Sequence, residues 1–233
     1  MNFDWNKDTI RWYQEANQYT GFFHHLADII APKLEGITSL CDIGCGLGLV
    51  DLELSKSIEH ITCIDIHPRA IEALQLKIRE QNITNIEPLH MDARDITQNF
   101  DAILISFFGS RSVEEFLPIC KKLIAVVANK SERELFPEKY RSFHKNNTEN
   151  VERYLKAQMI PYTTRLVCFE FGQPFSSFAE AKRFVRSLSK QITGEELDLF
   201  LSTQLVETGE ERTPFFLPHQ KTVTVFEIQG RLS

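Results

Sequence analysis

The stretch from Asp42 to Gly48, DIGCGLG, joins an acidic side chain to a turn rich in glycine. Glycine lets the backbone come close to a ligand and adopt positive φ angles. A helix that starts after such a turn offers unpaired N–H groups to an anionic group. The dinucleotide-binding fingerprint G-x-G-x-x-G would place its third glycine at Leu49, so this stretch indicates a different nucleotide-type ligand.

Two more acids follow apolar runs further along the chain. Asp65 stands in CIDIHP, and its spacing from Gly44 suits an acid that accepts hydrogen bonds from ribose hydroxyls. Asp92 follows the next run, in LHMDARDI. Proteins that bind nicotinamide dinucleotides also have the first of these acids, so a nicotinamide site remains an alternative.

The elements that position these acids alternate between strand-like and helix-like patterns. Residues 68–82 place Ile71, Leu74 and Ile78 at helical spacing, with a proline suited to the first turn. Short apolar runs, typical of strands buried on both faces, stand at 39–43, 61–65, 86–90, 101–107 and 123–128. This alternation predicts a parallel, doubly wound sheet.

Further elements are predicted on both sides of this region. Residues 8–34 have the pattern of one or two helices, and residues 163–171 and 221–228 have that of strands. Three capping-box pairs each predict a helix start, and the first of these helices is expected to run through residue 122, with a kink at a proline. The pairs and the proline are Ser112 with Glu115, Ser177 with Glu180, Thr193 with Glu196, and Pro118.

The order of these motifs resembles that of the class I S-adenosylmethionine-dependent methyltransferases. Asp42 to Gly48 resembles their motif I, and FDAILISFFGS (100–110) resembles motif IV. The resemblance implies an α/β fold with a doubly wound, mostly parallel, seven-stranded Rossmann-like sheet whose last strand is antiparallel. It also implies an N-terminal helical lid (1–36) and a methyltransferase domain (37–233) with an insert at about 129–160.

The resemblance implies S-adenosylmethionine as the cofactor. In that arrangement Asp42 faces the positive methionyl end, Asp65 accepts the ribose hydroxyls, and Asp92 lies at the adenine. The full set of expected cofactor-binding residues is Asp42, Gly44, Cys45, Gly46, Gly48, Asp65, Ile66, Asp92, Ala93 and Ser106. Phe107 and Phe108 are expected to line the substrate pocket, and no metal is expected.

Methyl transfer from a sulfonium depends mainly on alignment, so a fixed catalytic base is not required. His25 and Tyr13, in the N-terminal helices, are the candidate bases. The tetrad of enzymes that methylate base amines has prolines that are missing here, where the chain has Ser106-Phe107-Phe108-Gly109. Cys120, predicted to lie inside a helix, lacks the setting of a nucleophilic cysteine.

The amino-acid composition limits which class of molecule could accept the methyl group. A net charge of −6 and a pI of about 5.7 argue against a general nucleic-acid surface, and the charged segment 129–145 is interpreted as a solvated face. The expected function is methyl transfer to a small molecule. RNA or protein methylation and a non-catalytic S-adenosylmethionine-binding protein remain alternatives, and the oligomeric state is open. The polar N-terminus and the unpatterned cysteines predict a cytoplasmic protein with no membrane segment.

Overall fold

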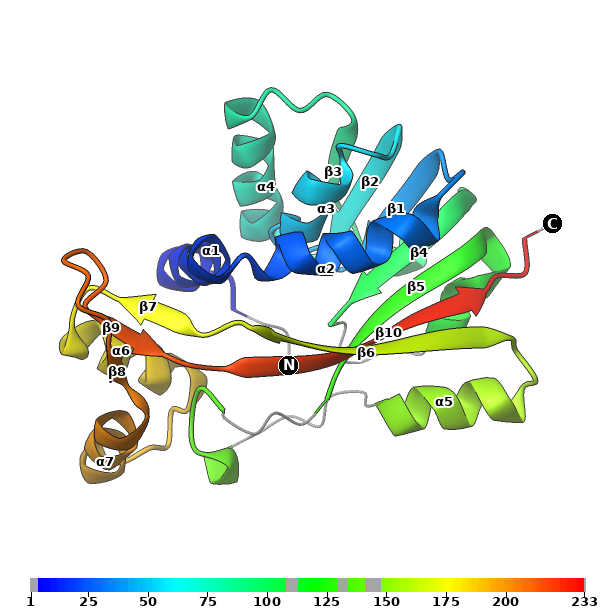
Figure 1. Ribbon diagram of the computed structural model, residues 1–233. Coiled ribbons are helices and arrows are strands. Elements are labelled where there is room, and N and C mark those ends of the chain that lie inside the picture. The colour runs from blue at the N-terminus through cyan, green and yellow to red at the C-terminus, as the bar shows by residue number, and fades with distance from the viewer. Residues whose placement is uncertain (1–3, 108–112, 130–133, 141–147, 233) are drawn as a thin grey trace.

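The computed structural model describes residues 4–107, 113–129, 134–140 and 148–232. Its main sheet has seven strands in the order β3-β2-β1-β4-β5-β10-β6 (Figure 1). The strands are β1 (Ser39–Ile43), β2 (His60–Asp65), β3 (Ile86–His90), β4 (Phe100–Ser106), β5 (Cys120–Ala128), β6 (Tyr162–Glu170) and β10 (Gln220–Gln229). The first five are parallel, and β10 is antiparallel to both of its neighbours. The predicted doubly wound sheet with an antiparallel last strand is confirmed.

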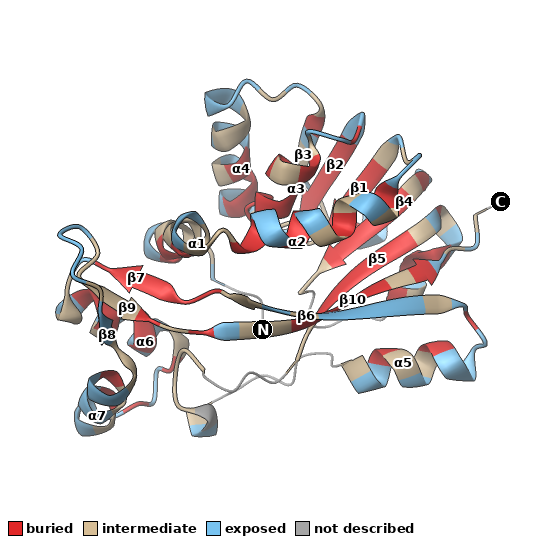
Figure 2. Ribbon diagram, in the orientation of Figure 1, coloured by how far each residue is buried: buried red, intermediate tan, exposed pale blue. Residues whose placement is uncertain are grey.

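The central strands are apolar on both faces because helices or helical turns cover both. On one face Leu40, Leu104 and Ile124 pack with residues of the N-terminal helices. On the other face, the alternate residues Ile103 and Leu123 form a second cluster. Figure 2 shows this burial along the middle of the sheet. Two-sided burial explains why these strands appear as continuous apolar runs in the sequence.

Helices α1 to α4 lie on one side of the sheet and α5 on the other (Figure 1). Asn6 caps the first helix through a complete capping box, and Gly21, with φ 67°, separates the first helix from the second. The helices are α1 (Lys7–Thr20), α2 (Phe22–Ile30), α3 (Leu49–Leu54), α4 (Pro68–Glu80), α5 (Thr148–Ala157), α6 (Phe178–Leu188) and α7 (Gly194–Gln204). Short 3₁₀ turns are η1 (Ala31–Leu34), η2 (Ala93–Asp95), η3 (Val113–Ile119) and η4 (Glu138–Tyr140). Among the described residues, no helix combines the length and apolar character needed to cross a bilayer.

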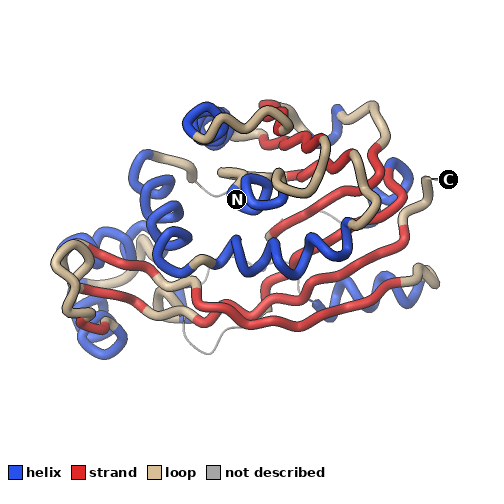
Figure 3. The backbone as a smooth tube through the Cα atoms, turned by 45° about the horizontal axis from the view of Figure 1, so that its top comes forward, coloured by secondary structure: helices blue, strands red, loops and turns tan. Residues whose placement is uncertain are grey.

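A second, three-stranded sheet was not predicted. It consists of β7 (Gln173–Phe175), β8 (Val206–Glu207) and β9 (Phe215–Leu217) in the order β7-β9-β8. Figure 3 shows that β6 continues toward β7 and that β9 leads into β10, so the small sheet extends the long antiparallel ribbon. Strands of two or three residues carry no alternation long enough to be recognised in a sequence.

The predicted helix running through residue 122 is wrong. The structure has a 3₁₀ turn over Val113–Ile119, and β5 begins at Cys120, which pairs with Phe100 of β4. Pro118 cannot donate a helical hydrogen bond, and pairing with the neighbouring strand outweighs the local helical pattern. Cys120 therefore lies in a buried strand and not in a helix. Ser112 lies outside the described residues, so its capping box has no structural test.

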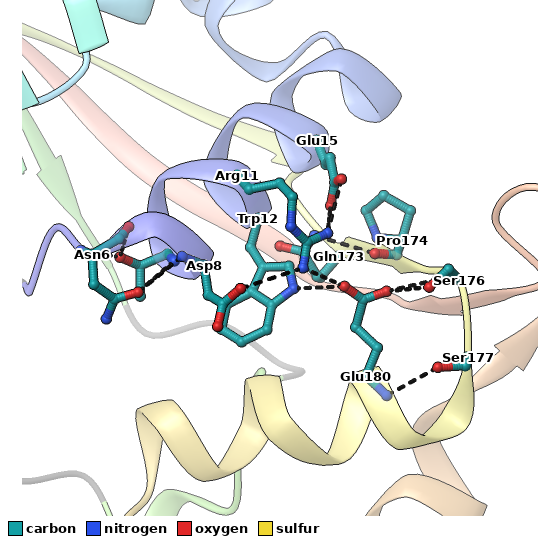
Figure 4. Close-up of polar contacts among 11 residues, drawn as sticks. Asn6, Asp8, Arg11, Trp12, Glu15, Gln173, Pro174, Ser176, Ser177 and Glu180 are labelled. Atoms are coloured by element: carbon teal, nitrogen blue, oxygen red, sulfur yellow. Dashed lines mark hydrogen bonds and ion pairs between the residues drawn. The ribbon is translucent and has the colours of Figure 1, made fainter. Parts of the chain in front are cut away.

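The N-terminal helix is attached to the small-sheet region through Glu180 (Figure 4). The buried carboxylate accepts hydrogen bonds from Arg11 Nη2 (2.5 Å) and Trp12 Nε1 (3.1 Å) of α1. It also accepts them from the backbone N–H and hydroxyl of Ser176 (2.9 and 2.7 Å). Burial alone would raise the pKa of Glu180, but these donors hold it at about 2. Glu180 thus fixes α1 in place, instead of completing the capping box predicted with Ser177.

Candidate functional site

The glycine turn after β1 has the backbone geometry that its sequence predicts. Gly44, Gly46 and Gly48 have φ angles of +74°, +55° and +62°, a region that residues with a Cβ rarely adopt. The N–H groups of Gly44 and Cys45 donate to the carbonyl of Ile64, at 2.8 and 3.1 Å. The turn is therefore attached to the end of β2, at the edge of the sheet where the parallel strands end.

Two of these glycines have different neighbours. A Cβ on Gly48 would lie 2.6 Å from Leu74 Cδ1, so this glycine allows α3 to pack against α4. A Cβ on Gly46 would lie 2.9 Å from Trp5 Cζ2. The bare backbone at Gly46 therefore lies directly against the indole of Trp5. Sequence reasoning missed Trp5, because a tryptophan near the N-terminus carries no motif.

Asp65 connects the ends of the first two strands. Its carboxylate accepts hydrogen bonds from the backbone N–H groups of Gly46 (2.9 Å) and His67 (2.8 Å). The residue is 8% exposed, and each carboxylate oxygen has a further lone pair for a ligand hydroxyl. The next residue, Ile66, is an exposed apolar side chain at 45%. This edge therefore combines an acceptor for hydroxyls with an apolar surface for a flat ring.

Asp42, near the end of β1, is buried close to Asp51 of α3. Asp42 is 1% exposed, and burial together with the Asp51 charge raises its pKa well above the usual range. Burial also raises the pKa of Asp51 to about 6, although contacts with Asp42 and the Cys63 thiol oppose it. Burial and the neighbouring acidic group therefore both favour the protonated form of Asp42. Neither carboxylate oxygen of Asp42 has a hydrogen-bond partner among the described residues, so its contact with a ligand stays a prediction.

Asp51 was not singled out from the sequence. The signal that could have found it is an acid on the apolar side of the short segment LVDLEL, where charged residues rarely lie buried without a partner.

The end of β4 adds two of the expected residues. Among the described residues, the buried Oγ of Ser106 has no hydrogen-bond partner, which is uncommon for a hydroxyl inside a protein. Phe107 follows with φ +58°, held by its N–H bond to the carbonyl of Val126 at 2.9 Å. Bulky residues rarely adopt this conformation, and when they do they cluster at functional sites. Phe108 lies outside the described residues.

Asp92 and Ala93 form the turn after β3. The Asp92 carboxylate accepts hydrogen bonds from the backbone N–H of Arg94 at 2.9 Å and from its guanidinium at 2.6 Å. Ala93 is buried beside it. The contact of both residues with an adenine ring stays a prediction.

The two candidate bases lie in different settings. Tyr13 packs against Trp5, Phe23 and Phe171, and burial raises its pKa above the usual range. Its phenol therefore stays protonated at neutral pH and suits a hydrogen-bond donor better than a base. His25 is exposed on α2, and its ring lies 5.5 Å from that of Phe169 on β6.

The structure thus brings the glycine turn, Asp65, Ile66 and the end of β4 to one edge of the sheet. The arrangement fits an adenosyl cofactor in three respects: the bare backbone at Gly46, the acceptor oxygens of Asp65, and the Ser106 hydroxyl that has no partner within the described part of the chain.

Comparisons with known proteins concern the family and the fold of this chain. Residues 40–130 match a family model described as a methyltransferase domain. A probable cobalt-precorrin-6B C(15)-methyltransferase (decarboxylating) from Methanococcus maripaludis is 33% identical over 90 residues, covering 38% of this chain and 50% of that protein. The chain therefore spans about half the length of the curated relatives that it matches first.

Solved structures agree over a longer stretch. The YcgJ protein from Bacillus subtilis aligns with a TM-score of 0.58 at 14% identity, covering 89% of this chain and 99% of that chain. Magnesium protoporphyrin IX methyltransferase from Synechocystis PCC 6803, solved with bound SAM, aligns with a TM-score of 0.53 at 10% identity, covering 99% and 87%. At these identities the likeness establishes the fold.

Proposed function

We propose that this chain, which belongs to the class I S-adenosylmethionine-dependent methyltransferase family, transfers a methyl group from S-adenosylmethionine to a small-molecule acceptor. One observation carries the proposal. Asp65 holds the N–H of Gly46 at 2.9 Å, which places an acceptor carboxylate directly beside a bare turn at the edge where the parallel strands end. A cofactor with a ribose and a charged amino-acid end matches both features.

Each residue at this edge has a role in binding. The free lone pairs of Asp65 would accept the ribose hydroxyls, and Ile66 with Ala93 would contact the adenine, next to Asp92. The Ser106 hydroxyl would gain the hydrogen-bond partner that it lacks among the described residues. Asp42, whose buried carboxylate oxygens have no partner among the described residues, would face the positive methionyl end of the cofactor.

When bound, S-adenosylmethionine supplies a methyl group that is already activated by the sulfonium. The protein then has to orient the acceptor and exclude water, and orientation alone can contribute about 7–11 kcal/mol. Trp5 over the turn and Phe107 at the end of β4 would exclude water. Helices α1 and α2 would form the lid, with α1 fixed by Glu180.

Two facts support a small acceptor. The relative from Methanococcus maripaludis is named for a small-molecule substrate, a cobalt precorrin. The net charge of −6 also disfavours a broad contact with nucleic-acid phosphates. The five cysteines are all free, which is typical of proteins in a reducing compartment, so we also propose a cytoplasmic location.

The test has two stages. Calorimetry with S-adenosylhomocysteine, the demethylated product, should show one binding site per chain, and NADH should not bind. Methyl transfer from labelled S-adenosylmethionine should then label a pool of small metabolites. Absence of S-adenosylhomocysteine binding would overturn the cofactor, label in RNA or protein would overturn the acceptor class, and binding without transfer to any pool would identify a non-catalytic sensor.

A further inference from the structure

The ammonium of Lys221 lies among three phenylalanine rings. Its Nζ is 3.7 Å from the ring centroid of Phe107, 4.7 Å from that of Phe171 and 5.1 Å from that of Phe22. Phe22 and Phe171 are buried, whereas Phe107 and Lys221 are partly exposed. A cation over aromatic faces is stabilised by the ring electrons.

The topology places this cation at the same edge as the cofactor site. Lys221 stands near the start of β10, which is antiparallel to β5, so it meets the end at which β5 and β4 finish. Its side chain shares a strand face with Val223 and Val225, which pack in the same cluster as α2 and α3. Because Phe107 directly follows Ser106, its contact with Lys221 places the ammonium near the end of β4.

The strand order also separates this cation from the proposed donor site. The turn and Asp65 belong to β1 and β2, whereas β10 is the third strand from β1 on the other side of β4. Neighbouring strands lie about 4.8 Å apart, so β10 lies roughly 14 Å from β1. A lysine that reaches back to the end of β4 therefore faces the acceptor side of the transferred methyl group.

We propose that Lys221 binds an anionic group of the methyl acceptor, so that the acceptor is a small organic anion with an apolar body. The inference rests on the proposed function, since it assigns the acceptor of that same site. The rings of Phe107, Phe171 and Phe22 limit the water around the ammonium, which strengthens its attraction for a carboxylate, sulfonate or phosphate. Phe107, which has φ +58° and directly follows β4, brings its ring centroid to 3.7 Å from this cation.

The experiment uses two aromatic dyes that differ by one sulfonate. Fluorescence titrations with 8-anilinonaphthalene-1-sulfonate and with the neutral N-phenyl-1-naphthylamine are carried out on the wild type, Lys221→Met and Lys221→Arg. Lys221→Met should weaken binding of the sulfonate dye roughly tenfold or more, and that of the neutral dye by less than about twofold. Lys221→Arg should keep the preference. Lys190→Met, which removes an exposed lysine after α6, should match the wild type.

Calorimetry with S-adenosylhomocysteine on the same variants separates the possible failures. Equal affinity in the wild type and Lys221→Met supports the assignment of the cation to the acceptor. A loss of that affinity in Lys221→Met would assign the cation to the methionyl carboxylate of the donor and overturn the proposal, as would an unchanged dye preference. If the wild type fails to bind S-adenosylhomocysteine while the dye preference still depends on Lys221, the anion site stands and the proposed function fails.

Discussion

Replacing Asp65 with asparagine tests the central contact of the site. The aspartate accepts two backbone hydrogen bonds, from Gly46 at 2.9 Å and His67 at 2.8 Å. Asparagine has one acceptor oxygen, so one N–H would face the side-chain NH₂ and lose its partner. A buried donor without a partner costs about 1–3 kcal/mol, which is the expected loss of unfolding free energy.

Binding of S-adenosylhomocysteine should weaken as well. A hydrogen bond to a charged acceptor contributes about 1.5–3 kcal/mol, so the loss of one ribose contact corresponds to roughly a 10- to 150-fold rise in Kd. If the Gly46 N–H loses its carboxylate partner, the turn is held less firmly, which lowers the affinity further. Calorimetry gives the affinity, and urea denaturation gives the stability of the same preparation.

Asp101 provides the matched control. It lies near the start of β4, at the opposite edge of the sheet, and accepts hydrogen bonds from Thr38, Ser39 and Lys121. These donors hold the pKa of Asp101 below its usual range. Asp101→Asn should therefore lose stability in a similar way and leave the affinity unchanged. A folded Asp65→Asn protein that binds S-adenosylhomocysteine as tightly as the wild type would refute the role of Asp65.

Three further changes follow from the geometry. Gly46→Ala should abolish S-adenosylhomocysteine binding in calorimetry. The control Gly36→Ala, at a glycine with a similar positive φ and no atom near the added Cβ, should only lower the free energy of unfolding, by about 1–2 kcal/mol. Equal affinities of the two variants for S-adenosylhomocysteine would contradict the close approach at Gly46. The pKa of Glu180 is about 2 in the fold against an ordinary 4.5, so its ionised form stabilises fully above about pH 4.5 and loses that contribution as the pH falls toward 2. Urea titrations should show the stability gap between wild type and Glu180→Gln narrowing over that window, and a constant gap would exclude this linkage. Burial raises the pKa of Asp51 to about 6 from an ordinary 3.8. The folded state therefore favours the protonated carboxyl, and its stability falls as the pH rises from about 4 to 6. Asp51→Asn should lessen this loss, and an equally steep loss in the variant would show that the buried pair with Asp42 does not titrate in this range.

The sequence by itself determined the existence of five parallel strands and the position of the glycine turn. Both are local signals: an apolar run buried on two faces, and a turn that needs positive φ at Gly44, Gly46 and Gly48. The strand β10 was found for the same reason, because its residues are apolar or β-branched over a long stretch. Of the charged segment 129–145, residues 130–133 and 141–145 lie outside the described residues.

Only the tertiary structure decided which side chains meet. Asp42 and Asp51 are buried close together although the glycine turn separates them in the sequence, and their contact with a cofactor stays a prediction. The start of β5 at Cys120 depends on a partner strand, and the small sheet depends on a ribbon formed by segments far apart in the chain. Lys221 reaches Phe107 across more than a hundred residues, so nothing in the local pattern of either residue predicts their contact, because packing and not spacing brings them together.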